Sequence, residues 1–276
     1  MSEPKPWTVV SIVGVGLIGG SFALALRKAG FAGKIIGVSS PETVRAALDR
    51  GVIDQALSLS EAAAQSDLLY LAQPIDRILT TLDGIEIDSY VAPGTLITDA
   101  GSTKAAIVAR AAKCIRRGRF VGGHPMAGKQ TRGVAEAEAG LFQGRPYVLT
   151  SHDAALEAWI QRIGARVVIL DAQEHDRLVA LTSHLPQLIS TALAASIAAE
   201  PGAARVTGPA AVDLTRLAMS PYEIWRDIFA TNGPSIDAAL GAFIERLQGL
   251  RAKLQTPAIE QEFERAASAA KSLRQG

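Results

Sequence analysis

The feature that most constrains this chain is a glycine-rich turn that follows an apolar, β-branched run. Residues 14–19 read Gly-Val-Gly-Leu-Ile-Gly, after the run at 8–13 and before a helical run that stops at Gly30. In G-x-G-x-x-G the first glycine permits a tight turn, the second admits a pyrophosphate, and the third lets helix and strand pack closely. The helix N-terminus then faces the phosphates. The pattern predicts a dinucleotide site, and a turn without ligand is the alternative. The predicted cofactor-binding residues are Gly14, Gly16, Leu17, Ile18 and Gly19.

Short apolar runs alternate with helical runs through the first part of the chain. Strands are predicted at residues 8–13, 34–38, 67–72, 95–98 and 120–122. Helices are predicted at residues 21–29, 41–50, 77–82 and 103–113. Two further strands, at 146–150 and 166–170, flank a predicted helix at 154–163. This alternation is typical of a parallel, doubly wound sheet with helices on both faces.

The pattern changes to helical from Ala172 to the end of the chain. The run 176–199 carries leucine and isoleucine at the spacing of one helix face, and Pro186 is expected to bend it. We therefore predict an α/β Rossmann-like dinucleotide-binding domain over residues 1–171. An all-α domain over residues 172–276 is small to stand alone, so we expect it to dimerise.

Composition excludes several functional classes. The chain has 28 basic and 27 acidic residues and only 5% aromatic residues, which favours neither nucleic acid nor an acidic membrane as partner. One cysteine, Cys114, cannot form an intrachain disulfide, so we expect a cytoplasmic protein. The uncharged stretch 8–26 approaches the length of a membrane span, but four glycines interrupt it at the spacing of a turn, and we expect no membrane segment.

The end of the second strand bears on the choice of cofactor. An NAD site commonly has Asp or Glu about 20 residues beyond the glycines, to bind the ribose 2′-hydroxyl. This chain has Ser39 and Ser40 there, followed by Arg45. Hydroxyl groups and an arginine suit a 2′-phosphate, so the sequence favours NADP, with NAD as the alternative. The serines are equally suited to capping a helix that begins at Pro41.

Three further motifs place reactive side chains near the predicted site. Residues 98–104 (TDAGSTK) and 122–128 (GGHPMAG) each follow a predicted strand, so Ser102 and His124 are expected at the carboxyl edge of the sheet. Residues 183–187 (SHLPQ) place His184 beside the proline in the long helical run. A helix cap for Ser102 and a buried structural role for His184 are the alternatives.

Taken together, these motifs resemble those of the prephenate and arogenate dehydrogenases of tyrosine biosynthesis. The resemblance rests on GVGLIGGSFA at 14–23, the three motifs above, and DLTRLA at 213–218 followed by Trp225, all in the family's order. It implies oxidative decarboxylation of prephenate or arogenate with NAD(P)+. It also implies a homodimer joined by the helical domains, and no metal. We expect no fused mutase domain before Trp7 and no regulatory domain after Gln255.

The resemblance also implies roles for single residues. His124 matches the family's catalytic histidine, and Ser102 matches the serine that hydrogen-bonds the same substrate hydroxyl and histidine. Arg216 matches an arginine that binds a substrate carboxylate, and His184 matches a histidine that lines the substrate pocket. The chain departs from the family at Lys129 and Gln130, where Thr-Glu is common, and lacks the usual basic residue before Asp213. We expect Lys129 and Gln130 to contact the substrate side chain, and prephenate to be preferred.

Two other functions compete with this interpretation. Dehydrogenases of 6-phosphogluconate and 3-hydroxyisobutyrate share the predicted architecture, but they use a lysine in the helical domain, and this chain has no lysine between Gln130 and Lys253. A regulator that binds NADP without turnover is the second alternative. It would have no use for the trio of His124, Ser102 and Arg216.

Overall fold

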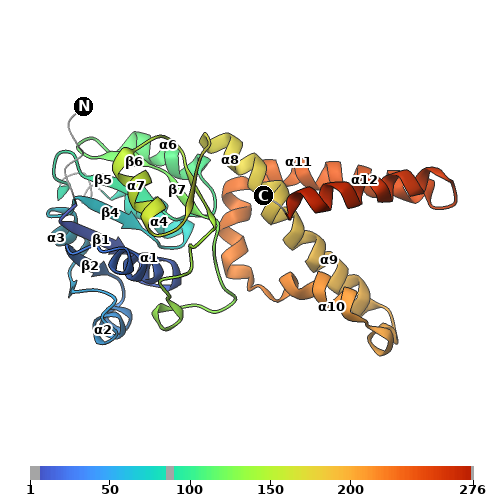
Figure 1. Cartoon of the computed structure of the whole chain (residues 1–276), viewed down its shortest axis with the longest axis horizontal. Helices are drawn as coiled ribbons and strands as arrows, with labels where there is room; N and C mark the ends of the chain where they lie inside the picture. The colour runs from blue at the N-terminus through green and yellow to red at the C-terminus, as the bar shows by residue number, and fades with distance from the viewer. Residues whose placement is uncertain (1–6, 85–89, 275–276) are drawn as a thin grey trace.

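The computed structural model describes residues 7–84 and 90–274, in two parts that lie side by side (Figure 1). The first part is an α/β domain, and the second is built from helices that follow β9. The predicted Rossmann-like domain followed by an all-α domain is confirmed.

The α/β domain is organised around a six-stranded parallel sheet in the order β3-β2-β1-β4-β5-β6. This order reverses direction between β1 and β4, and ligands bind at such a switch point. The strands are β1 (Val9–Val13), β2 (Lys34–Val38), β3 (Gln55–Ala56), β4 (Leu68–Leu71), β5 (Leu96–Asp99) and β6 (Arg119–Val121). The connecting helices are α1 (Leu17–Lys28), α2 (Pro41–Asp49), α3 (Leu59–Ala63), α4 (Ile75–Asp83) and α6 (Ala105–Cys114). The short elements β3 and α3 were not predicted, because each offers too few residues to set a period.

A separate three-stranded sheet follows β6. It contains β7 (Gly123–Pro125), antiparallel to β8 (Pro146–Leu149), and β9 (Arg166–Ile169), parallel to β8, with α7 (Ala154–Arg162) between β8 and β9. Strands at 146–150 and 166–170 were expected, but not their separation from the main sheet. Strand β7 was read as a loop because its glycine and proline are poor strand formers. His124 therefore stands within a strand rather than after one.

Buried aromatic rings join the two sheets. Phe22 of α1 stacks on Tyr70 of β4, with ring centroids 4.1 Å apart. The hydroxyl of Tyr147 on β8 donates to the hydroxyl of Tyr70 over 3.0 Å. Because both tyrosines are fully buried, each hydroxyl needs this partner, and the contact fixes the small sheet against the large one.

The helical part packs against helices α4 and α6, which cover the face of the main sheet opposite α1 and the small sheet. Ile228 and Ile236 of α11 join the buried cluster that contains Ile78 of α4 and Ile107 of α6. Its elements are α8 (Ala172–Val179), α9 (Leu185–Ala199), α10 (Pro209–Thr215), α11 (Tyr222–Lys253) and α12 (Ala258–Leu273). This part also has short 3-10 turns at Ala203–Val206 and Arg216–Met219, and the α/β domain has one at Val134–Glu136. The α11–α12 hairpin projects away from the sheet (Figure 1).

The long run expected to bend at Pro186 is irregular in the turn just before the proline. A π-helical turn at Ala180–His184 joins α8 to α9, and Pro186 follows directly, with no N–H for the carbonyl of Thr182 inside that turn. Leu181, expected on the buried face, is 57% exposed. By length and apolar composition the run Ala172–Ala199 could cross a membrane, a property that core helices also have.

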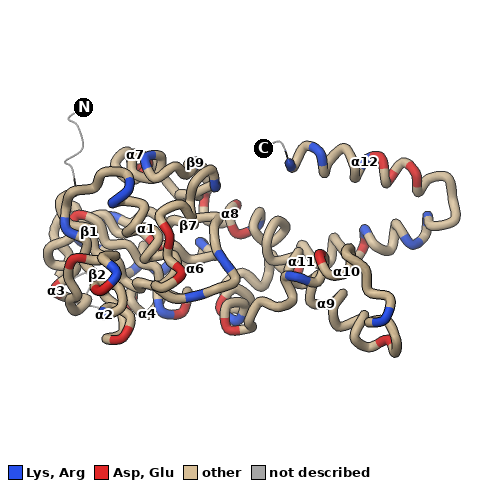
Figure 2. The backbone as a smooth tube through the Cα atoms, turned by 60° about the horizontal axis from the view of Figure 1, so that its bottom comes forward, with Lys and Arg blue, Asp and Glu red and all other residues tan. Residues whose placement is uncertain are grey.

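Charged residues of both signs are interspersed along both parts of the chain (Figure 2). This agrees with the formal net charge of +1.

The glycine turn yields a prediction about stability. A Cβ added at Gly19 would lie 2.1 Å from the carbonyl oxygen of Gly14 and 2.8 Å from a methyl group of Ile12, whereas one added at Gly16 would have no neighbour within 4 Å. Gly19→Ala should lower the free energy of unfolding by about 1–3 kcal/mol or more, because α1 must move off the sheet. Gly16→Ala should stay within about 1 kcal/mol of the wild type. Urea denaturation of the pair checks this, and equal stability would contradict the close packing at Gly19.

Candidate active site

The glycine turn forms an open cradle at the carboxyl end of β1. Gly14 has a φ of 94°, and a side chain there would meet the backbone of Ala72 after β4 at 2.7 Å. Helix α1 has no side-chain cap at Gly16 and no acidic residue in its first turn. Its first N–H groups and its dipole are therefore available to an anion, and the open space at Gly16 lets a phosphate approach. The residues present fit a dinucleotide.

The serines after β2 have different surroundings. The Ser40 side chain accepts a hydrogen bond from the backbone N–H of Thr43 over 3.3 Å and caps α2. Ser39 and Arg45 are exposed, and neither side chain makes a hydrogen bond within the described residues. The capping alternative thus applies to Ser40, while Ser39 and Arg45 are available to a ligand at this edge.

Asp99, at the end of β5, organises the loop that carries Ser102. Its buried carboxylate pairs with the buried ammonium of Lys104 and accepts from the N–H of Gly101 over 2.8 Å. The same carboxylate accepts from the N–H of Gly123 on β7 over 3.1 Å. Burial lowers the pKa of Lys104, and the charge of Asp99 opposes that shift. Asp99 therefore fixes the Ser102 loop relative to the strand of His124.

Three side chains form a relay that ends at His124. Nδ1 of His124 lies 2.8 Å from Nε2 of His175, and Nδ1 of His175 lies 2.7 Å from a carboxylate oxygen of Asp176. A carboxylate only accepts, so His175 carries its proton on Nδ1 and offers the lone pair of Nε2 to His124. His124 then carries its proton on Nδ1, which leaves Nε2 with a free lone pair. The geometry makes His124 a base.

The surroundings of His124 keep it neutral. Burial lowers its pKa well below the usual histidine value, and the neighbouring His175, Lys104 and His184 lower it further. A neutral imidazole can accept a proton, so the electrostatics and the relay both favour His124 as a general base.

Asp176 also caps a helix of the other domain. Its carboxylate accepts from the backbone N–H groups of Lys104 (2.7 Å) and Ala105 (2.9 Å), at the start of α6, which has no cap of its own. Sequence reasoning missed His175 and Asp176, which fit a polar stretch of an amphipathic helix. His175 and His184 are nine residues apart, about two and a half turns of an α-helix, and would face opposite sides. The π-helical turn between them changes that register.

His184 lies deeper in the same cluster. It is 1% exposed, and its ring meets that of Trp225 edge to face at 5.9 Å. Its Nδ1 lies 3.4 Å from the side-chain nitrogen of Asn232 in α11. Burial lowers the pKa of His184 to about 4; Asp176 opposes that shift, and His175 adds to it. His184 is therefore neutral near pH 7.

A cavity of about 400 Å³ contains most of the residues predicted to bind substrate. Lys129, Gln130 and Arg216 line it, together with Gln187 and Trp225. Arg216 is exposed and forms no ion pair within the described residues, whereas Lys129 pairs with Glu138 at 2.9 Å. His184 stands behind this lining, in contact with Trp225.

Ser102 lies half-buried in the loop after β5. Its hydroxyl makes no hydrogen bond within the described residues, so the expected contact with His124 is not formed here. Its assigned role stays a prediction.

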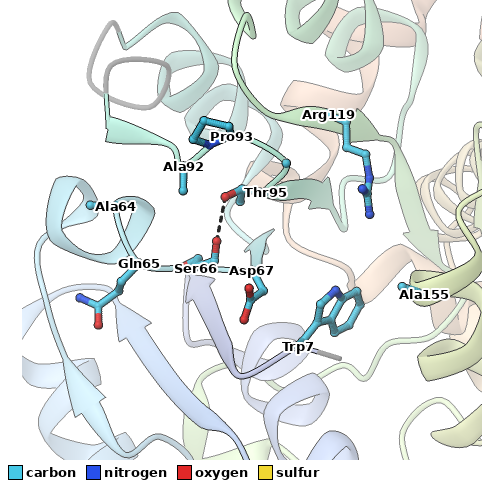
Figure 3. Close-up of a pocket in the computed structure, with 11 residues that line it drawn as sticks. Trp7, Ala64, Gln65, Ser66, Asp67, Ala92, Pro93, Thr95, Arg119 and Ala155 are labelled. Atoms are coloured by element: carbon cyan, nitrogen blue, oxygen red, sulfur yellow. Dashed lines mark hydrogen bonds between the residues drawn. The ribbon is translucent and has the colours of Figure 1, made fainter. Parts of the chain in front are cut away.

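A second cavity lies at the opposite edge of the main sheet (Figure 3). It measures about 390 Å³, and Trp7, Asp67 and Thr95 line it just before β1, β4 and β5. Open α/β sheets bind ligands at the other end of their strands, so this cavity is not the candidate site. Across residues 7–84 and 90–274, no group of three or more His, Cys, Asp or Glu residues is arranged to hold a metal ion.

Comparison with family models places the whole arrangement in one family. Residues 22–172 match the model "Prephenate dehydrogenase, nucleotide-binding domain", and residues 171–267 match "Prephenate dehydrogenase, dimerization domain". The two matches meet where β9 gives way to α8.

Individual relatives agree with the family models. The prephenate dehydrogenase of Lactococcus lactis is 34% identical over 92% of this chain and 74% of its own length. The Aquifex aeolicus prephenate dehydrogenase, solved with hydroxyphenyl propionate and NAD+, superposes with a TM-score of 0.85 at 28% identity, over 100% of this chain and 99% of that one. Synechocystis arogenate dehydrogenase gives 0.84 at 27% identity, over 96% and 99%. The chain belongs to the prephenate dehydrogenase family of NAD(P)-dependent oxidoreductases.

Proposed function

We propose that this protein catalyses the oxidative decarboxylation of prephenate to 4-hydroxyphenylpyruvate, with NADP+ preferred over NAD+. The observation that carries the proposal is the relay from Asp176 through His175 to His124, together with a cavity lined by Lys129 and Arg216. The L. lactis relative bears the name of this activity.

The relay assigns the proton transfer. As the ring hydroxyl of prephenate becomes a carbonyl, Nε2 of His124 accepts its proton, and the positive charge that develops is shared with His175 and Asp176. The chemistry that the nicotinamide supplies when bound is acceptance of hydride from the carbon bearing that hydroxyl. The bond to the ring carboxylate then breaks, its electrons complete the aromatic ring, and the carbonyl oxygen takes back the proton held by His124 as the phenol hydroxyl forms. Carbon dioxide itself needs no proton to leave. Ser102 is proposed to hydrogen-bond the same hydroxyl.

The cavity lining supports prephenate over arogenate. Both substrates carry two carboxylates, which Lys129 and Arg216 of the lining can bind, and the lining contains no carboxylate. Arogenate carries an ammonium group that needs an acceptor, and the nearby Glu138 is already paired with Lys129. Arg216 is proposed to bind one carboxylate, His184 to line the pocket and contact the substrate, and Lys129 with Gln130 to face the keto-acid side chain. The Synechocystis structure, named an arogenate dehydrogenase, keeps arogenate as the second candidate substrate.

The exposed residues after β2 support NADP. Arg45 and Ser39 are unengaged, and no acidic side chain stands at the end of β2 to repel a 2′-phosphate. A non-catalytic NADP-binding regulator would need neither the relay nor an unpaired Arg216.

We further propose a cytoplasmic homodimer joined by the helical domains. One model matched by the chain is described as a dimerization domain. Large apolar side chains are exposed on the helical part, as expected for a surface that a second copy covers. These are Val206, Val212, Leu214, Met219, Tyr222, Leu254, Phe263 and Leu273.

The proposed reaction is tested by a two-by-two matrix of prephenate or arogenate with NADP+ or NAD+, followed by the absorbance of the reduced nicotinamide. The fastest turnover is expected with prephenate and NADP+. Ser39→Asp should then favour NAD+, because a carboxylate binds the ribose hydroxyl and repels a 2′-phosphate. If folded protein that binds cofactor shows no turnover in any of the four mixtures, the proposed activity is wrong.

Loss of the base should affect chemistry and spare cofactor binding. His124→Asn keeps a similar volume but cannot accept the hydroxyl proton. We expect kcat to fall by about 100-fold or more, with the Kd for NADP+ nearly unchanged. Steady-state kinetics and fluorescence titration measure the two quantities. Near-normal turnover would exclude His124 as the base.

The pH profile should reflect the lowered pKa of His124. Turnover needs neutral His124, whose pKa is lowered, so activity is lost only when the pH falls below that lowered value. The acid limb of kcat/KM is therefore expected below about pH 6.5, the value of an unperturbed histidine. An acid limb above pH 7 would show that His124 is not held neutral.

A further inference from the structure

Helix α11 is interrupted at Asn232. This residue has φ −133° and ψ 18° within an otherwise helical run, two residues before Pro234. Proline lacks the N–H that would bond the carbonyl of Ala230 and crowds that carbonyl, so the helix kinks here. The Asn232 side chain is 3% exposed and reaches α8 and the π-helical turn.

The contacts of Asn232 fix the orientation of its amide. Its Nδ2 lies 2.8 Å from the backbone carbonyl oxygen of Asp176. A carbonyl oxygen only accepts, so the amino edge of the amide must face Asp176. The same Nδ2 lies 3.4 Å from Nδ1 of His184, a long contact to which its second hydrogen can be directed. Because an amide nitrogen only donates, Nδ1 of His184 presents a lone pair.

The proton of neutral His184 is then on Nε2. Within the described residues His184 makes no hydrogen bond other than the one at Nδ1, so Nε2–H is free to donate to a ligand. The groups that face this ring are Asp176 and His175 of α8, His124 of β7, and Trp225 and Asn232 of α11. Burial keeps the pKa of His184 near 4, so the ring donates as a neutral group at physiological pH.

We propose that Asn232 is a positioning residue that holds His184 in the Nε2–H tautomer, so that His184 offers a neutral N–H donor to an anionic group of the substrate. The tautomer follows from the contacts of this chain alone. Only the identity of the anionic group, a carboxylate of prephenate, rests on the proposed function.

This assignment makes His124 and His184 chemically different. His175 accepts from Nδ1 of His124 and leaves Nε2 as a base. Asn232 donates to Nδ1 of His184 and leaves Nε2–H as a donor. The same imidazole thus serves as proton acceptor at one position and hydrogen-bond donor at the other, according to the partner at Nδ1.

The test is nitrogen NMR of the full chain labelled with ¹⁵N-histidine. The chain has four histidines, and His184→Gln assigns the signal of His184. Wild-type protein at pH 7 is expected to show His184 protonated at Nε2 and bare at Nδ1. Protonation at Nδ1, or a doubly protonated ring, would overturn the proposal. This readout needs no substrate and no turnover, so it stands apart from the test of the proposed activity.

Variants extend the test to substrate binding. Asn232→Asp replaces the donor at Nδ1 by an acceptor, which should shift the His184 proton to Nδ1 or charge the ring. KM for prephenate should then rise roughly tenfold or more, the scale of one hydrogen bond to a charged group, with kcat reduced less. Thr231→Val, which removes the neighbouring 2.8 Å bond to Thr103, is the matched control and should leave the His184 signal unchanged. An Asn232→Asp spectrum identical to that of the wild type would contradict the assignment even if KM changed.

Discussion

The carboxylate of Asp176 is the contact on which the site depends. It caps the first turn of α6 and accepts the proton of His175 in a hydrogen bond, while the backbone carbonyl of the same residue accepts from Asn232. Helix α4 shows the same arrangement, because Asp227 of α11 accepts from the N–H of Asp76 over 3.2 Å. Neither α4 nor α6 has a side-chain cap of its own. The helical domain supplies both caps and two members of the relay, so the relay is complete only where the two domains are in contact.

Charge in this cluster is balanced by pairs, and His124 and His184 stay neutral because their pKa values are lowered. The buried ion pair of Asp99 and Lys104 holds the loop after β5, and the carboxylate of Asp176 is matched by two backbone N–H groups and by His175. Burying a charge without such partners is costly. The consequence is a site whose buried groups have no spare positive charge, so a cationic anchor for the substrate has to come from the exposed rim, where Arg216 stands.

Local patterns made the α/β domain and the cofactor cradle predictable. A β-branched run followed by G-x-G-x-x-G is informative because local geometry requires glycine at these positions. Gly14 has a positive φ, and Gly19 packs too closely on the strand to carry a side chain. The relay could not be predicted in this way. His175 and Asp176 act on His124 across 51 and 52 residues of chain, and nothing in their own helix marks them out. Strand β7 was hidden by its glycine and proline, and Asn232 by a kink inside a long helix. Ser102, His124 and Arg216 came from resemblance to a family, which carries information about tertiary contacts that a single sequence lacks.

The π-helical turn at Ala180–His184 makes the chain tolerant to some changes and intolerant to others. A π turn is one residue longer than the α turn it replaces. Deleting one residue within it would let the helix continue as regular α with His184 in nearly the same orientation, because nine steps through a π turn rotate the chain about as far as eight α steps. The turn thus sets the rotation of every later side chain. Point substitutions on the exposed face of this turn, such as at Leu181, leave that rotation untouched. Homologues are therefore expected to keep the second histidine in the pocket either with this turn or with one residue fewer and a regular α-helix, whereas a regular helix of the same length would turn that histidine away from His175.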